Sequence, residues 1–303
     1  MKHFSFLLGL FVAFTSLFVS CSEDEKDSTV CTVTVKCVGH GTVFITKYIG
    51  TSADVLIGSL IEVTATPDDG YAFTGWYTEE YETPVSTDPF FEFVAMEDIT
   101  LTARFIMGEI NGHEYVDLGL PSGLKWACCN VGAKKPEEYG GYYAWGETEE
   151  KSNYYLDTYK WCNGTYNSLT KYCTDSDDGR VDNKTVLDPE DDVAHVKWGG
   201  SWRMPTLEEQ KELLDECTWE WTELNGVNGY RVTGPKGNSI FLPAAGYRRG
   251  LELFGRGTGG YYWSSLLYDT NGYYAYYLHF HDDRHYWFYY DRDHGHSVRP
   301  VCE

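Results

Sequence analysis

The sequence predicts two domains that combine strands with at least one helix, and three observations support that prediction. Residues 32–35 and 61–65 alternate between apolar and polar side chains, which is the period-two pattern of half-buried strands. Residues 206–209, Thr-Leu-Glu-Glu, have the spacing of a capping box and open a helix that we expect to run to about Cys217. Glycine-punctuated segments follow and are typical of short strands. The 303-residue chain exceeds one ordinary domain, so two are expected.

The N-terminal residues predict export and lipid anchoring. A short polar start precedes the apolar stretch 4–19, which ends at Ser20 and Cys21 in the order of a secretory signal. Residues 17–21 resemble a lipobox, in which the cysteine thiol is diacylated and becomes the mature N-terminus. A plain signal peptide with an incidental cysteine is the alternative. We therefore expect residues 1–20 to be a lipoprotein signal peptide and Cys21 to be the lipidation site.

An acidic run follows the cysteine directly. Residues 22–25 read Ser-Glu-Asp-Glu, which resembles the signal that sends lipoproteins of Bacteroidota to the outer face of the outer membrane, although such runs are commonly only a solvated tether. We expect residues 21–30 to be an acidic tether and the protein to be anchored in the outer membrane, facing outside, through its lipid alone. The formal charge of −22 argues against nucleic acid as a partner, because that partner needs a basic patch.

Residues 31–107 are predicted to form a small β-rich domain. The segments that carry a family resemblance include GYAFTGWY at 70–77 and MEDITLTARF at 96–105, together with 41–43 and 63–67. They resemble the divergent internalin B-type repeat, which implies a β-grasp-like module. We expect a bacterial repeat that acts as a spacer and lifts the next domain off the membrane.

Residues 108–303 carry a set of tryptophan- and glycine-rich motifs. These are VDLGLPSGLKWA at 116–127, YYAWGE at 142–147, WGGSWRMPT at 198–206, GGYYWSS at 259–265 and GHSVRPV at 295–301. They resemble the Fibrobacter succinogenes major paralogous domain family. The resemblance implies a C-type lectin-like fold, a compact α+β module with long irregular loops, and the long polar segment 150–195 suits such a loop.

The window 268–296 has an unusual composition. Its 29 residues hold eight Tyr, five His and five Asp, and no Lys, Glu, Gln or Met. Every residue in it except Trp287 can be encoded by a codon that ends in cytosine with the first two bases randomised. That is the footprint of adenine-directed mutagenesis, as in target proteins of diversity-generating retroelements; a drifted family member without diversification is an equal alternative. We expect Leu278, Phe280 and Trp287 to lie in the core.

We expect this window to hold a ligand-binding surface, because Tyr, His and Asp combine amphipathic contact area with hydrogen bonding. The ligand would be an extracellular protein or, as the second choice, a glycan. The alternative function is that of a structural surface protein or an adhesin without diversification. The predicted ligand-binding residues are His279, His281, Asp282, Asp283, Arg284, His285, Tyr286, Phe288, Tyr289, Tyr290, Asp291, Asp293 and His294.

Two other clusters suggest a metal. Eight carboxylates between residues 175 and 192 could hold calcium, although a solvated acidic loop is the expectation. His279 and His281 stand two apart on one strand face and could suggest zinc, but the codon pattern accounts for the number of histidines without a metal. We therefore assign no metal ligand and no cofactor, and keep calcium as the open alternative.

No enzymatic activity is predicted. The sequence lacks Gly-x-Ser-x-Gly and His-Glu-x-x-His motifs. The formylglycine-generating enzymes share the lectin-like fold and use a cysteine pair, but Cys128 and Cys129 are adjacent and lie in an early segment. Cys162 and Cys173 could close a local loop, although the sequence does not fix any disulfide connectivity.

Overall fold

The computed structural model describes residues 30–303 except 49, 69, 70 and 81. Strands hold 46% of the described residues and helices 8%, in six sheets, so the molecule is mostly β and the α+β prediction is wrong. Only two α-helices form in the described part, α1 (Val193–Trp198) and α2 (Leu207–Glu216). The long polar segment before α1 lacks a helical apolar period and folds instead as irregular chain with two short 3₁₀ turns, η1 (Leu156–Thr158) and η2 (Pro189–Asp191).

The predicted signal peptide 1–20, the lipidation site Cys21 and the predicted tether up to residue 29 lie outside the described residues. Helices α1 and α2, of 6 and 10 residues, both fall short of the length and hydrophobicity that a bilayer span requires, and the described residues contain no other candidate.

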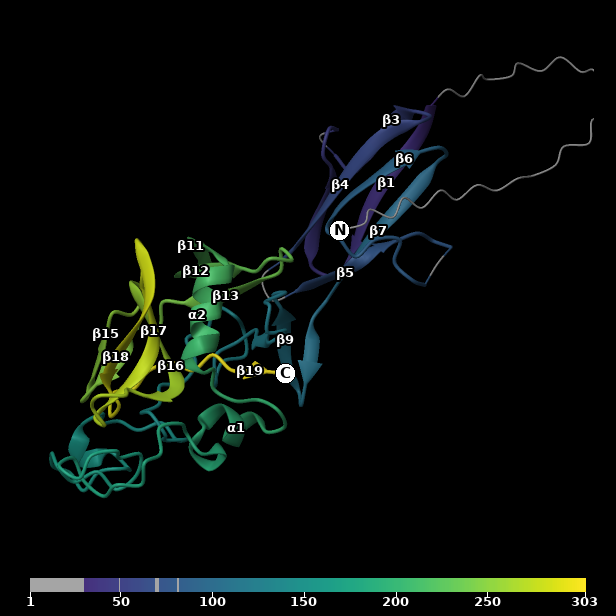
Figure 1. The fold of residues 1–303 in the computed structure, drawn as a ribbon. Helices are drawn as coiled ribbons and strands as arrows, with labels where there is room; N and C mark the ends of the chain where they lie inside the picture. The colour runs from purple at the N-terminus through teal and green to yellow at the C-terminus, as the bar shows by residue number, and fades with distance from the viewer. Residues whose placement is uncertain (1–29, 49, 69–70, 81) are drawn as a thin grey trace, which may run out of the picture.

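Residues 30–106 form two sheets that enclose a separate core (Figure 1). Inward and outward side chains alternate, so that Val33, Val35, Ile61 and Val63 are buried and their neighbours are not. No helix lies among the described residues of this part, and a second sheet replaces the helix of a β-grasp module. The sheets are β3-β1-β7-β5 and β2-β4-β6, with β1 (Val30–Val38), β2 (Gly41–Ile45), β3 (Ser52–Leu56), β4 (Ser59–Pro67), β5 (Ala72–Tyr77), β6 (Phe90–Ala95) and β7 (Ile99–Ile106).

Residues 108–303 contain four further sheets around a tryptophan-rich core. Trp145, Trp202 and Trp263 are fully buried in one cluster of this core. The strand orders are β19-β10-β9-β8, β11-β12-β13, β14-β15 and β16-β17-β18. The strands are β8 (Gly108–Ile110), β9 (His113–Asp117), β10 (Lys125–Ala127), β11 (Thr218–Leu224), β12 (Val227–Thr233), β13 (Ser239–Pro243), β14 (Tyr247–Arg249), β15 (Glu252–Phe254), β16 (Gly259–Leu267), β17 (Tyr274–His281), β18 (Arg284–Asp291) and β19 (Val301–Cys302).

Helix α2 forms as its sequence predicts and packs on the sheet that contains the predicted site. Thr206 Oγ1 accepts from the Glu209 amide at 3.2 Å, and the Glu209 carboxylate accepts from the Thr206 amide at 2.8 Å, which completes the capping box. The buried side chain of Gln210 donates to the carbonyls of Tyr262 and Trp263 at 3.0 and 3.1 Å. Helix α2 is therefore hydrogen-bonded to β16, the strand next to the predicted site.

The motif near the C-terminus holds separate strands together through Arg299. Its guanidinium is 1% exposed and donates to the carbonyls of Ala127, Cys128 and Phe241 at 2.8–3.0 Å and to the Asn130 side chain at 2.9 Å. Four hydrogen bonds compensate for the burial of the charge.

A single residue, Met107, separates β7 from β8, and the two parts of the chain have separate cores. The Phe73 amide donates to Asn238 Oδ1 at 3.2 Å across the junction. That residues 31–107 and 108–303 fold independently stays a prediction.

Candidate functional site

The predicted ligand window folds mainly as the hairpin β17–β18, which lies at the end of the molecule away from residues 30–106 (Figure 1). Strand β17 pairs with β16 on one side and with β18 on the other, which makes β18 an edge strand. Side chains of paired strands alternate between the two faces of the sheet. The predicted site residues are therefore divided between two faces, and they do not form one patch.

One face of the hairpin borders a pocket of about 190 Å³, which we call the aromatic basin. Strand β18 contributes three side chains two residues apart, and β17 contributes two across from them, as the register requires. Strands β14 and β16 each add a tyrosine, and a histidine that follows β18 completes the set. The lining residues are Tyr247, Tyr261, Tyr277, His279, Tyr286, Phe288, Tyr290 and His296.

His296 lies at the buried side of the basin and has unused hydrogen-bonding capacity. Its ring is 1% exposed and stacks on Trp263 with centroids 3.8 Å apart. Neither ring nitrogen has a hydrogen-bond partner, although buried polar atoms are nearly always paired. Burial holds the pKa of His296 well below its usual range, so the ring is neutral and offers one donor and one acceptor.

Three other polar groups of the basin, those of Tyr261, Tyr277 and His279, are neutral as well. Burial raises the pKa of Tyr261 to about 12 and moves the pKa of Tyr277 further upward, so both hydroxyls keep their protons. Burial, followed by the neighbouring His281, lowers the pKa of His279 to about 4. The basin thus combines aromatic rings with uncharged hydrogen-bonding groups.

The opposite face of the hairpin serves packing. Leu278 and Phe280 are buried in the core, as expected. Trp287 is 42% exposed, so the prediction that it belongs to the core is wrong. It lies on the edge strand β18, which has a neighbouring strand on one side alone among the described residues. Its ring centroid is 5.7 Å from that of Tyr276 and 5.1 Å from the Lys211 ammonium.

Two predicted ligand residues, His285 and Tyr289, also lie on this packing face. His285 stacks on Trp219 with centroids 4.6 Å apart, and its Nδ1 has no hydrogen-bond partner. Tyr289 stacks on Tyr268 at 3.8 Å. Neither side chain lines the aromatic basin.

The turn and the far end of the hairpin hold the remaining predicted residues. Asp282, Asp283 and Arg284 are exposed at the turn, where Arg284 and Asp283 form an ion pair at 3.6 Å. His281 is half-buried beside the basin. Asp291 is the last residue of β18, and the chain turns back toward the core after it.

Asp293 and His294 are buried, which was not expected of an exposed ligand surface. With Arg249 and Asp291 they line a separate polar pocket of about 140 Å³. Burial, followed by the nearby Asp291 carboxylate, raises the pKa of Asp293 to about 7. Burial lowers the pKa of His294 to about 4, and its Nδ1 has no hydrogen-bond partner.

Four lining residues of the basin were missed by the sequence reasoning, namely Tyr247, Tyr261, Tyr277 and His296. Tyr277 stands two residues before His279 on one strand, so strict period-two reasoning could have found it. Tyr247 and Tyr261 come from other strands, and only the tertiary fold brings them to the hairpin.

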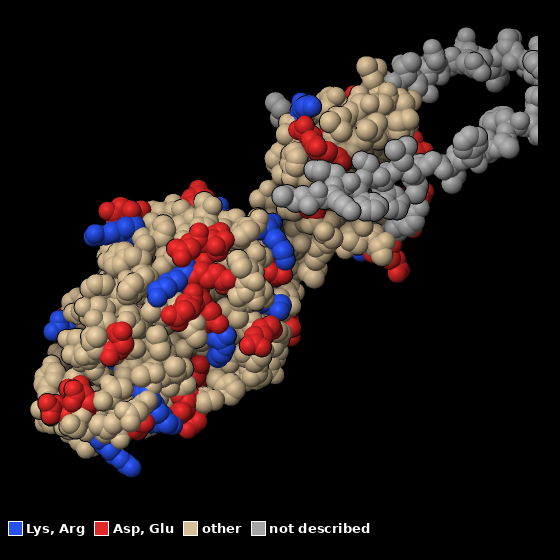
Figure 2. Space-filling view, in the orientation of Figure 1, with Lys and Arg blue, Asp and Glu red and all other residues tan. Residues whose placement is uncertain are grey.

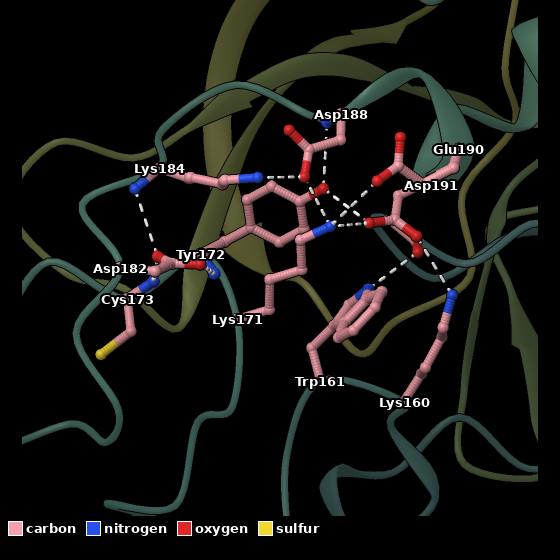
Figure 3. A network of polar contacts seen from close by, with 11 residues as sticks. Lys160, Trp161, Lys171, Tyr172, Cys173, Asp182, Lys184, Asp188, Glu190 and Asp191 are labelled. Carbon is pink, nitrogen blue, oxygen red and sulfur yellow. Dashed lines mark hydrogen bonds and ion pairs between the residues drawn. The ribbon is translucent and has the colours of Figure 1, made fainter.

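The acidic loop proves to be a network of lysines and carboxylates (Figure 3). Asp191 is 2% exposed and accepts from Lys160, Lys171 and the Tyr172 hydroxyl at 2.6–3.1 Å. Asp188 lies 2.5 Å from the ammonium of Lys171 and at the same distance from that of Lys184.

Backbone amides use two more of these carboxylates. Asp182 accepts from the amides of Tyr172 and Cys173 at 3.0 Å, and Asp192 caps α1. Within the described ranges, no group of three or more His, Cys, Asp or Glu side chains could hold a metal ion. The loop carboxylates thus fix the chain path of this segment.

The adjacent thiols Cys128 and Cys129 are buried or partly buried and keep their protons. Burial raises the pKa of Cys129 to about 11 and moves that of Cys128 further upward, so neither is a thiolate near neutral pH. Cys162 and Cys173 are thiols, and they donate to the carbonyls of Thr165 and Asp175 at 3.2 and 3.0 Å instead of bridging each other.

Charged side chains of both signs are interspersed over the face of the molecule drawn in Figure 2, and no basic patch gathers on that face.

Comparison with known proteins identifies one segment. Comparisons with curated proteins and with solved structures give no match to the chain. Residues 31–108 match the family model of the divergent InlB B-repeat domain, so this N-terminal segment is a bacterial repeat of this kind.

Proposed function

We propose that residues 108–303 are a binding module and that its ligand, an extracellular protein or glycan, inserts a ring or side chain into the aromatic basin. On the motifs described above, we also propose that this part is related to the Fibrobacter succinogenes major paralogous domain family. A concave, mostly aromatic pocket with a few convergent polar groups is the usual form of a binding site.

The observation that carries the proposal is the unpaired, buried ring of His296. An unsatisfied buried polar group costs about 1–3 kcal/mol. A ligand that hydrogen-bonds to His296 would recover that free energy, while the surrounding rings would stack on its apolar face. A sugar ring meets both demands, and so does a tyrosine or histidine side chain of a protein partner.

The test replaces the two nitrogens and keeps the ring. The full chain and its His296→Phe variant would be compared on a glycan array and in binding to immobilised extracellular proteins. Phenylalanine can still stack on Trp263, so the variant should fold. Its affinity for a ligand should fall roughly 10- to 100-fold, because one buried hydrogen bond is lost.

The matched control is His285→Phe. His285 also stacks on a tryptophan and also has an unpaired ring nitrogen, but it lies on the packing face of the hairpin. This variant should bind as the unaltered chain does. Equal affinities of both variants and the unaltered chain would refute the role of the basin.

We further propose that the module is displayed outside the cell as a lipoprotein anchored through Cys21, with the internalin-type repeat as its spacer. A Cys21→Ala chain that still partitions with membranes would contradict the anchor.

Diversification of the hairpin codons remains part of the proposal. It requires, beside the gene, a reverse transcriptase gene and a near-copy of the 3′ end with adenines at these codons.

A further inference from the structure

His279 and His281 form an unusual pair at the rim of the aromatic basin. Their Nε2 atoms lie 3.0 Å apart. Nδ1 of His279 lies 3.1 Å from the Gly260 carbonyl oxygen, and Nδ1 of His281 lies 3.1 Å from the Thr258 carbonyl oxygen. Both rings are therefore fixed in orientation by the main chain of β16 and the residue before it.

These contacts determine where the ring protons are. A carbonyl oxygen can only accept, so each Nδ1 must carry the hydrogen that it donates. In a neutral imidazole the other nitrogen is then an acceptor, which leaves two Nε2 lone pairs facing each other at 3.0 Å. Two acceptors at hydrogen-bond distance repel, and a cation between them converts that repulsion into attraction.

The second contact of each ring matches the surroundings of metal-bound histidines. A histidine that ligates a metal commonly donates its other N–H to a backbone carbonyl, which fixes the tautomer and the ring plane. Both rings of this pair do so. The two histidines stand at alternate positions of β17 and so share one face of the sheet.

We infer that His279 and His281 together bind one divalent transition-metal ion through Nε2, as cis ligands, at the rim of the aromatic basin. With metal–nitrogen bonds of about 2.0–2.1 Å, the 3.0 Å separation corresponds to an N–metal–N angle of about 95°. An angle near 90° suits the tetragonal coordination of Cu²⁺ or Ni²⁺ better than a tetrahedral zinc site.

The protein supplies only these two ligands, since the described residues offer no third His, Cys, Asp or Glu side chain. Water, or a donor atom of a molecule in the basin, would take the remaining positions. Arg284 is the residue that pairs with His281 across the hairpin, so a positive charge lies beside the proposed site. That charge is partly offset by the Asp283 carboxylate, 3.6 Å from the guanidinium. The inference does not rest on the proposed function, and it stands if no ligand of the basin is found.

The experiment titrates the full, chelator-treated chain with NiCl₂ by isothermal calorimetry, with NiCl₂ chosen because Cu²⁺ oxidises thiols and Cys37 is exposed. The unaltered chain should bind one equivalent that His281→Gln loses or binds at least tenfold more weakly. His40→Gln, an exposed histidine of the N-terminal part, is the matched control and should keep the site. Thermal unfolding without metal establishes that all three proteins are folded.

A second readout identifies the ligands directly. In a Cys37→Ser background, the electron paramagnetic resonance spectrum of one bound Cu²⁺ should show coupling to imidazole nitrogen, and His281→Gln should remove it. Identical Ni²⁺ binding by the unaltered chain and His281→Gln would overturn the inference. So would nitrogen NMR that shows one proton shared between the two Nε2 atoms in a chain that binds no metal.

Discussion

At the residue scale, two buried side chains beyond β18, Asp293 and His294, have protonation states opposite to those of the free residues between about pH 4 and pH 6.5. Asp293 keeps its proton toward neutral pH, and His294 stays neutral well into the acid range, because burial disfavours the charged form of each. Both side chains line the polar pocket next to the aromatic basin.

Asp293 should make the protein less stable as pH rises. The unfolded chain ionises this carboxyl near its ordinary pKa of 3.8, while the folded chain holds the proton up to about pH 7. Between these values the unfolded state releases a proton that the folded state retains. As pH increases through this range, Asp293 therefore lowers the free energy of unfolding by about 2–4 kcal/mol.

The variant Asp293→Asn isolates this contribution. It should match the unaltered chain near pH 4 and exceed it in the free energy of unfolding by about 2–4 kcal/mol near pH 8, measured by urea denaturation. Asp282→Asn, an exposed carboxyl in the hairpin turn, is the control and should show no such divergence. A constant difference between Asp293→Asn and the unaltered chain across this range would contradict the assignment.

At the element scale, strand alternation sorts the side chains of the hairpin β17–β18 onto two faces. Leu278 and Phe280 enter the core from one face, while Tyr286 and Phe288 border the basin on the other. The edge position of β18 leaves even the packing face partly open at Trp287.

Two tryptophans should therefore differ strongly in their effect on stability. Trp263→Ala removes a fully buried ring and should lower the free energy of unfolding by about 3–5 kcal/mol. Trp287→Ala removes an exposed ring that lies beside Tyr276 and Lys211, and should cost about 1 kcal/mol or less. Thermal unfolding of both variants measures the difference, and a loss at Trp287 as large as that at Trp263 would show that it belongs to the core after all.

The sequence allows some of these elements to be predicted and not others. The strands predicted at residues 32–35 and 61–65 and helix α2 follow from local periodicity and capping, and they form as predicted. The α+β prediction followed from the family resemblance, and it is wrong because residues 108–303 form four sheets and only two short α-helices among the described residues. Codon composition marked Tyr286, Phe288 and Tyr290, but it carries no information about which face a side chain occupies or about Tyr247, which tertiary packing adds to the basin.

At the scale of the whole molecule, two separate cores meet at a very short junction. The core of residues 30–106 includes Trp76, which is fully buried, and shares no residue with the clusters of residues 108–303. Cooperative unfolding follows the packed core, so two cores permit two transitions.

Trp76→Ala should unfold the N-terminal part alone. The substitution removes a buried ring and should cost about 3–5 kcal/mol within that small core. Differential scanning calorimetry should show the transition of residues 30–106 shifted to lower temperature or lost, with the other transition unchanged. A single transition in the unaltered chain that shifts as a whole would show that the two parts unfold as one unit.

The one-residue junction at Met107 has a consequence for how neighbouring molecules would act together. A long flexible linker lets a binding head search a wide volume, whereas a single residue between two hydrogen-bonded strands leaves few rotatable bonds. Each copy would then hold its basin in a fixed orientation relative to its own repeat. Several copies together gain avidity from a polymeric ligand only where its repeat spacing matches the spacing of the basins, so that spacing would help to select among targets.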